Sequence, residues 1–128
     1  MNDELFKKLV KDLQSIRFER SNLSEKQMEV RVMKSMETKG YKVIRQDSTV
    51  HGRTDLVIKM GIERICIELK QYAIATVLSQ LDRYSVENDA IILGCWKASE
   101  TVRIVFNEAK KVTKIPIELI EFRSHQPW

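Results

Sequence analysis

Long apolar runs are missing from this sequence of 128 residues, and none approaches the ~20 residues that a membrane-spanning helix needs. The first residues, Met1 to Glu4, also lack the pattern of a signal peptide. Internal repeats, linkers and low-complexity tracts are absent as well. We therefore expect a cytoplasmic protein with no membrane partner, folded as a single domain over residues 1–128.

Cysteine is scarce. The only two, Cys66 and Cys95, lie inside apolar runs and not at a spacing typical of metal ligands. We interpret both as buried thiols in a reducing compartment. A pair of zinc ligands or a disulfide is the alternative for these residues.

Neither sign of charge dominates the composition. Charged residues make up 31% and hydrophobic residues 43% of the chain, as in an ordinary globular protein. The net charge of +4 is a mild basic excess, which permits a nucleic-acid partner without demanding one.

Hydrophobic periodicity predicts alternating helices and strands. The expected helices cover residues 5–20, 24–39, 73–86 and 99–112, and the expected strands cover residues 41–45, 54–58, 65–70, 89–96 and 115–122. Ser24 and Ser99 are good N-cap residues, and Gly40 is a good C-cap residue. The order α-α-β-β-β-α-β-α-β predicts an α/β domain whose mixed central sheet is flanked by helices on both faces. Residues 46–53 are expected to form a polar loop, and residues 124–128 a loose tail.

The two strands at the centre of this order carry an unusual set of charges. A turn at Gly61 joins them and is too short for a crossover, so they should form an antiparallel hairpin. On the second strand, one face is apolar while the other bears Glu68 and Lys70. If helices cover both faces of the sheet, such charges need partners, a metal or a wet cleft.

Pairing about the Gly61 turn brings Asp55 opposite Glu68, with their Cβ atoms ~5 Å apart. Two carboxylates that close repel each other, and a hard divalent cation between them relieves the repulsion. Lys70 lies one pleat further along the same face as Glu68. The pattern therefore indicates a metal site with a lysine beside it.

Asp55, a gap of twelve residues and then Glu68-Leu69-Lys70 resembles the D-(x)n-E-x-K signature of the PD-(D/E)xK nuclease superfamily. Within that superfamily the chain is most similar to archaeal Holliday junction resolvases. Their active-site glutamate falls on Glu29 in "EVRVMKSMETKGYKVIR", eleven residues before Gly40. The resemblance implies a restriction-endonuclease-like core.

The sequence also departs from this pattern. Thr54 stands where proline is common, residues 1–20 form an extra helix, and "LSQLDRYS" is closer to the Q-L-x-x-Y helix of other nuclease branches.

The resemblance implies roles for individual residues. Asp55, Glu68 and the carbonyl of Leu69 would bind Mg²⁺ or Mn²⁺, and Lys70 would position or deprotonate the attacking water. Glu29 would hold the outer shell of the metal or a second metal, and cleavage would leave a 5′-phosphate. Basic side chains near the site would contact DNA phosphates: Arg45, Arg53, Arg64 and Arg83. Possible accessory residues are Glu25, Ser48, Gln80 and Tyr84.

Each assignment has a structural alternative. Asp55 could cap the turn at residues 52–53, and Glu68 with Lys70 could be a surface ion pair on an edge strand, worth ~0–1 kcal/mol. Glu25 competes with Glu29 for the same role, and Gln80 and Tyr84 could simply pack at the edge of the core. The single loop histidine, His51, is assigned no role.

These expectations converge on a Mg²⁺-dependent DNA endonuclease that is selective for DNA structure, as a Holliday junction resolvase in recombination and repair is. The alternatives are a duplex- or flap-cutting nuclease of a mobile element, virus or repair system, and a non-catalytic nucleic-acid-binding module. Cutting two strands in register requires two sites, so we expect a homodimer. The helix over residues 5–16 or that over 102–112 would supply the contact, unless both merely cover the sheet.

Overall fold

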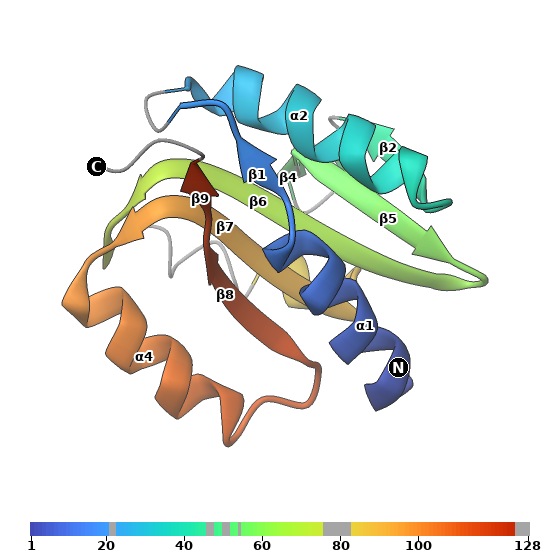
Figure 1. Cartoon of the computed structure of the whole chain (residues 1–128). Helices are drawn as coiled ribbons and strands as arrows, with labels where there is room; N and C mark the ends of the chain where they lie inside the picture. Colours follow the sequence, from blue (N-terminus) through green and yellow to red (C-terminus); the bar gives the residue numbers. More distant parts are fainter. Residues whose placement is uncertain (21–22, 46–47, 50–51, 54, 76–82, 125–128) are drawn as a thin grey trace.

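Five strands form a mixed sheet at the centre of the computed structural model, which describes residues 1–20, 23–45, 48–49, 52–53, 55–75 and 83–124. The strand order is β2-β5-β6-β7-β8, antiparallel between β2, β5 and β6 and parallel from β6 to β8 (Figure 1). The strands span β2 (Lys42–Arg45), β5 (Leu56–Met60), β6 (Glu63–Ala73), β7 (Ala90–Ala98) and β8 (Ile117–Glu121). The predicted α/β architecture with a mixed sheet is confirmed.

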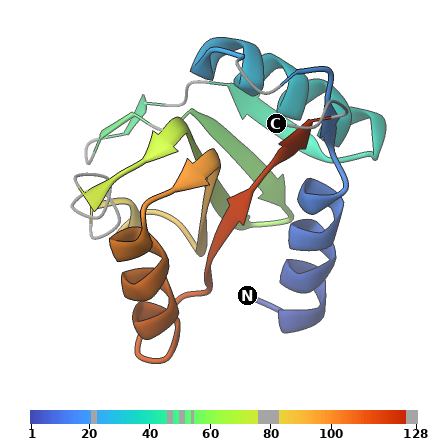
Figure 2. The ribbon, with the colours of Figure 1, turned by 60° about the vertical axis from the view of Figure 1, so that its left-hand side comes forward.

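Helices cover both faces of this sheet (Figure 2). The helices α1 (Asp3–Gln14) and α2 (Glu25–Thr38) lie on one face, and α4 (Glu100–Lys110) lies on the other. The first face buries Ile65, Ile67 and Leu69 of β6, and the second buries Cys66. Both cysteines are buried free thiols, as expected. No helix in the described ranges is long and apolar enough to cross a membrane.

The local sequence sets the limits of α2. The Ser24 hydroxyl accepts from the Gln27 N–H at 3.2 Å, and the Gln27 side chain accepts from the Ser24 N–H at 2.9 Å. This reciprocal capping satisfies two backbone donors at the helix start. At the other end Gly40 adopts a φ of +94°, a conformation that favours glycine, and the chain turns into β2.

The β5–β6 hairpin has the predicted register. Gly61 at its turn has a φ of +64°, and Leu56 pairs with Ile67. Residues 55 and 68 come next in this register, just beyond the end of β5. The antiparallel pairing predicted from the turn position is confirmed.

Several segments differ from the sequence-based expectations. The first helix ends at Gln14 and not at residue 20, because the following residues form β1 (Arg17–Phe18), which pairs in parallel with β9 (Arg123–Ser124). Phe18 is fully buried against the rings of Trp96 and Phe122, at centroid distances of 4.7 and 5.0 Å. These contacts across the fold decide the local structure.

The loop over residues 46–53, the segment before β7 and the C-terminal tail also differ in detail from the expectations. Short antiparallel strands β3 (Ser48–Thr49) and β4 (Gly52–Arg53) pair within the loop. Ala73 ends β6 and does not begin a helix; residues 83–85 are helical, while residues 76–82 lie outside the described part. The expected tail begins with a residue of β9, and residues 125–128 lie outside the described part.

Candidate active site

The candidate site forms where β5 and β6 part. Strand β5 begins at Leu56, which pairs with Ile67 of β6, whereas β6 continues beyond Ile67 to Ala73. Beyond Ile67, the backbone N–H groups on the β5 side of β6 donate to carboxylates and not to a neighbouring strand. Leu69 N–H donates to Asp55 Oδ2 at 2.7 Å, and Gln71 N–H donates to Glu25 Oε2 at 3.4 Å. Side chains thus take over the hydrogen bonds of the missing strand, which fixes two carboxylates at the opening.

Asp55, Glu68 and Lys70 lie on the same face of the hairpin, opposite the face that packs against α1 and α2. Glu68 is 5% exposed, and its Oε1 lies 3.5 Å from Lys70 Nζ. Strand β6 is central in the sheet, so the alternative of a surface ion pair on an edge strand is wrong. Asp55 is half-buried, and its carboxylate accepts a hydrogen bond from the Leu69 N–H of β6. This contact ties Asp55 to β6, whereas the alternative had it cap the turn at residues 52–53.

The two carboxylates perturb each other. Burial, together with the negative charge of Asp55, raises the pKa of Glu68 to about 7, although the charge of Lys70 opposes the rise. Burial likewise raises the pKa of Asp55, against the lowering effect of the Leu69 N–H, and the charge of Glu29 adds to the rise. A site that holds both groups ionised therefore requires additional positive charge.

Glu29 reaches the same region from α2, around the end of β5. Its side chain is 5% exposed, and Arg45 Nε donates to its Oε1 at 2.7 Å. The charge of Glu29 acts on Asp55 more strongly than that of Glu25, which is itself exposed. Both glutamates are thus near the opening, but only Glu29 is buried and held by an arginine.

The remaining predicted residues are distributed unevenly. Tyr84 is 4% exposed, and burial followed by the charge of Glu68 raises its pKa to about 12, so it lies beside the site. Its neighbour Arg83 is exposed. Arg64 lies on the same face of β6 as Glu68, but four residues nearer the turn, about 13 Å along the strand. The side chains of Ser48 and Arg53, on β3 and β4, and the whole of Gln80 lie outside the described part.

The donor set fits a magnesium ion. Glu68 Oε2 is buried and has no hydrogen-bond partner within the described ranges, which is costly for an oxygen of a carboxylate. The same ranges contain no cluster of three or more Asp, Glu, His or Cys side chains that could hold one ion. Mg²⁺ suits such a site, because it is commonly bound by one or two carboxylates with water and substrate oxygens completing its shell.

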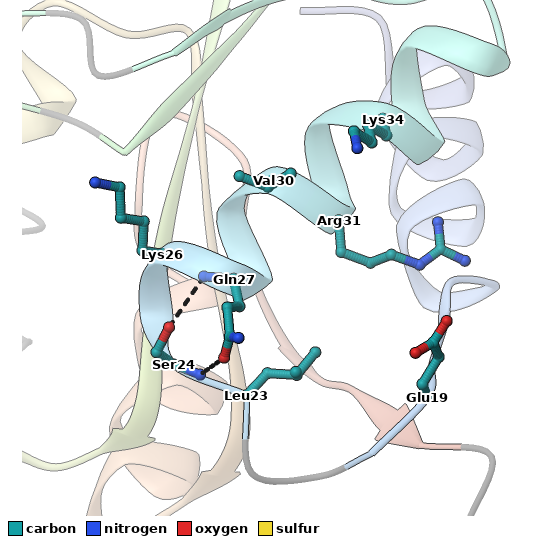
Figure 3. Close-up of a pocket in the computed structure, with 8 residues that line it drawn as sticks. All are labelled: Glu19, Leu23, Ser24, Lys26, Gln27, Val30, Arg31 and Lys34. Carbon is teal, nitrogen blue, oxygen red and sulfur yellow. Dashed lines mark hydrogen bonds between the residues drawn. The ribbon is translucent and has the colours of Figure 1, made fainter.

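A separate hollow of about 580 Å³ lies along the outer side of α2 (Figure 3). Three of its lining residues, Gln27, Arg31 and Lys34, lie on the side of the helix away from Glu29, so the hollow opens away from this site. The one arginine in it, Arg31, donates to Ser35 and to the Arg17 carbonyl. The lining residues are Glu19, Leu23, Ser24, Lys26, Gln27, Val30, Arg31 and Lys34.

Comparison with known proteins supports the fold. No family model matches the sequence, and no curated protein matches it. The structure is similar to the crystal structure of a repair endonuclease from Pyrococcus abyssi, with a TM-score of 0.61 and 20% sequence identity. The alignment covers 80% of this chain and 48% of that chain, so this chain spans about half the length of the archaeal protein. The likeness shows that the two chains share an α/β fold.

Two features of the site were missed in the sequence. Arg45, which is expected to contact DNA phosphates, pairs with Glu29, and the sequence does not indicate this pair. Gln71 bridges β6 to the start of α2, since its side chain donates to the Leu23 carbonyl at 2.9 Å. Alternation along β6 marks Gln71 as pointing away from Glu68, which was the available signal.

Proposed function

We propose that this protein is a Mg²⁺-dependent endonuclease that hydrolyses DNA phosphodiester bonds at Asp55, Glu68 and Lys70. The observation that carries the proposal is the buried Glu68 beside Asp55, where β5 leaves β6. An ionised Glu68 is unfavourable there without a cation, because burial and its neighbour both raise its pKa. The similarity in fold to a repair endonuclease supports the same activity.

Glu68 Oε2 and the second oxygen of Asp55 would hold the ion, because Asp55 Oδ2 already accepts from Leu69. The Leu69 carbonyl is a reasonable further ligand. In an extended strand the N–H and C=O of one residue point to the same neighbour, and the N–H of Leu69 points to Asp55. When bound, a divalent cation lowers the pKa of a water and screens the charge of the phosphate.

Lys70 would complete the chemistry. Its ammonium group lies 3.5 Å from Glu68 Oε1 and its side chain is 30% exposed, so it can contact both the carboxylate and an incoming phosphate. There it would position the attacking water and stabilise the negative charge that develops on the phosphate oxygens. Glu29, held by Arg45, would orient the outer shell. Arg53, Arg64 and Arg83 are proposed to contact the DNA backbone.

A non-catalytic nucleic-acid-binding module is the second candidate. Such a module gains nothing from a buried carboxylate that has an unpaired oxygen, whereas a metal-dependent enzyme needs it. This favours the catalytic reading. Selectivity for a branched DNA structure, as in a Holliday junction resolvase, is part of the proposal, with a duplex- or flap-cutting repair nuclease as its nearest rival.

A homodimer is proposed from the need for two cuts. Helices α1 and α4 each bury one side against the sheet. α4 exposes Ile104 (54%) and Val105 (37%), whereas α1 exposes Leu5 (45%), so α4 offers the larger apolar surface for contact. Light scattering at micromolar concentration tests this. A monomer both free and on DNA would remove the resolvase subtype.

A cleavage panel tests the activity. Junction, flap, duplex and single-stranded DNA are incubated with the protein and Mg²⁺, alongside Asp55→Ala, Glu68→Ala and Lys70→Ala. We expect each substitution to abolish cleavage while leaving the fold and DNA binding largely intact. Removal of a carboxylate should tighten binding in the absence of metal, since it relieves repulsion with phosphate. Cleavage by Glu68→Ala at the wild-type rate would place the chemistry elsewhere.

A further inference from the structure

An exposed tyrosine lies two residues beyond Lys70 on β6. Exposure rises along this part of the strand, from Glu68, which is buried, through Lys70, which is intermediate, to Tyr72 at 65%. A large aromatic side chain left this exposed loses the stabilisation that burial would give it. Tyr72 is therefore a candidate for contact with a ligand.

The backbone points Tyr72 to the side of the active site. Its neighbour Gln71 bonds to Leu23 at the start of α2, on the opposite face of the sheet. Because successive side chains of a strand alternate, Tyr72 points to the face of Glu68 and Lys70. Its Cα lies about 7 Å along the strand from that of Lys70. This is close to the separation of successive nucleotides in an unstacked strand.

A lysine lies beside Tyr72 on the neighbouring strand. Lys97 of β7 is its register partner and is exposed. Lys97 is near enough to lower the pKa of Glu121, but both oxygens of Glu121 already accept from Arg103 at 2.8 Å. Within the described ranges Lys97 forms no ion pair, so its ammonium group is available to an anion.

We propose that Tyr72 and Lys97 form a binding site for an unpaired nucleotide next to the cleaved phosphate. The Tyr72 ring stacks on the base, and the Lys97 ammonium binds the adjoining phosphate. The pairing suits a nucleotide because every base has an aromatic face, while its backbone carries a negative charge. A base that is stacked and paired within a continuous duplex does not offer that face.

This inference rests on the proposed nuclease activity and specifies its substrate. DNA with unpaired nucleotides beside the cut, such as a flap or a splayed arm, gains the stacking contact. A continuous duplex of the same sequence does not. Among the branched substrates of the proposed nuclease, the site therefore favours those with unpaired nucleotides at the branch, and it raises flap cutting above the cutting of a fully paired junction.

Binding and cleavage are measured on a flap and on a matched duplex. Tyr72→Leu keeps an apolar side chain but removes the ring, and Tyr72→Phe keeps the ring. We expect Tyr72→Leu to weaken flap binding and cleavage roughly 5- to 150-fold with little effect on the duplex, and Tyr72→Phe to restore the wild-type values. Lys97→Ala should weaken flap binding and reduce the slope of the logarithm of the binding constant against the logarithm of salt concentration by about one.

The control is Ile62→Ala. Ile62 is 97% exposed in the turn at the other end of β6, so its replacement should change the binding and cleavage of neither the flap nor the duplex. Equal losses on both substrates with Tyr72→Leu, or no loss, would overturn the stacking site. A wild-type protein that cuts no DNA would overturn the nuclease proposal instead. The stacking site is then still judged by binding, from the fluorescence of 2-aminopurine in the flap: quenching that Tyr72→Leu abolishes supports it, and unchanged fluorescence refutes it.

Discussion

Replacing Glu68 by glutamine should stabilise the protein at neutral pH when no divalent ion is present. Burial and the charge of Asp55 raise the pKa of Glu68 from 4.5 to about 7. Ionised Glu68 is therefore disfavoured in the folded state, and the free energy of unfolding should fall as the pH rises from about 4.5 to about 7. Above pH 7 the loss is complete and amounts to about 3 kcal/mol.

Glutamine keeps the shape of the side chain and cannot ionise. At pH 8 the Glu68→Gln variant should exceed the wild type in free energy of unfolding by up to about 3 kcal/mol, and the difference should vanish near pH 4. Urea unfolding at several pH values, in EDTA, measures both proteins. Mg²⁺ should then stabilise the wild type, because an ion that binds only the folded site favours folding. It should leave the stability of the variant unchanged, because the variant lacks the Glu68 carboxylate that would hold the ion.

The opposite pattern would refute this reasoning. If Glu68→Gln is no more stable than the wild type at pH 8, and both show the same pH dependence, the carboxylate of Glu68 is not held in an unfavourable environment. The argument for a cation between Asp55 and Glu68 would then lose its main support.

Three further predictions concern the site and the core of the sheet behind it. Arg45→Met leaves the buried Glu29 without its arginine and should lower the free energy of unfolding by about 2 kcal/mol, below the usual range for a buried pair because Arg45 is 33% exposed; urea unfolding checks this. Gly94→Ala should cost about 1–3 kcal/mol in a thermal melt, because the added Cβ would lie 2.5 Å from Phe122 Cε2. Cys66 should resist alkylation at pH 8 until the protein unfolds, since burial raises the pKa of its thiol; rapid labelling of the native protein would contradict this.

The geometry of the hairpin could be predicted from the sequence because its signals are local. Gly61 marks the turn, and alternation along residues 65–70 fixes which side chains share a face. Together they place residue 55 opposite residue 68, and the observed register agrees. The caps of α2 and α4 were predictable for the same reason, since Ser24 and Ser99 bond to backbone only three residues away.

Contacts between distant segments could not be predicted in this way. Ile16 continues the helical stripe of α1, so the sequence extends that helix too far. Phe18 becomes part of a strand only because Trp96 and Phe122 bury it. Likewise, Arg45 and Glu29 come from different elements, and nothing in the local sequence indicates that they pair. Periodicity reports which side of an element is buried, but not what it meets there.

The rate of DNA cleavage in Mg²⁺ tests the central claim most directly. One end-labelled DNA carrying a flap is incubated with wild-type protein and with Glu68→Gln, each in Mg²⁺ and in EDTA. We expect cleavage only by the wild type in Mg²⁺, while the folded Glu68→Gln protein still binds the DNA. Cleavage by both proteins at equal rates, or cleavage that persists in EDTA, would contradict the assignment of a metal-dependent nuclease site to Asp55, Glu68 and Lys70.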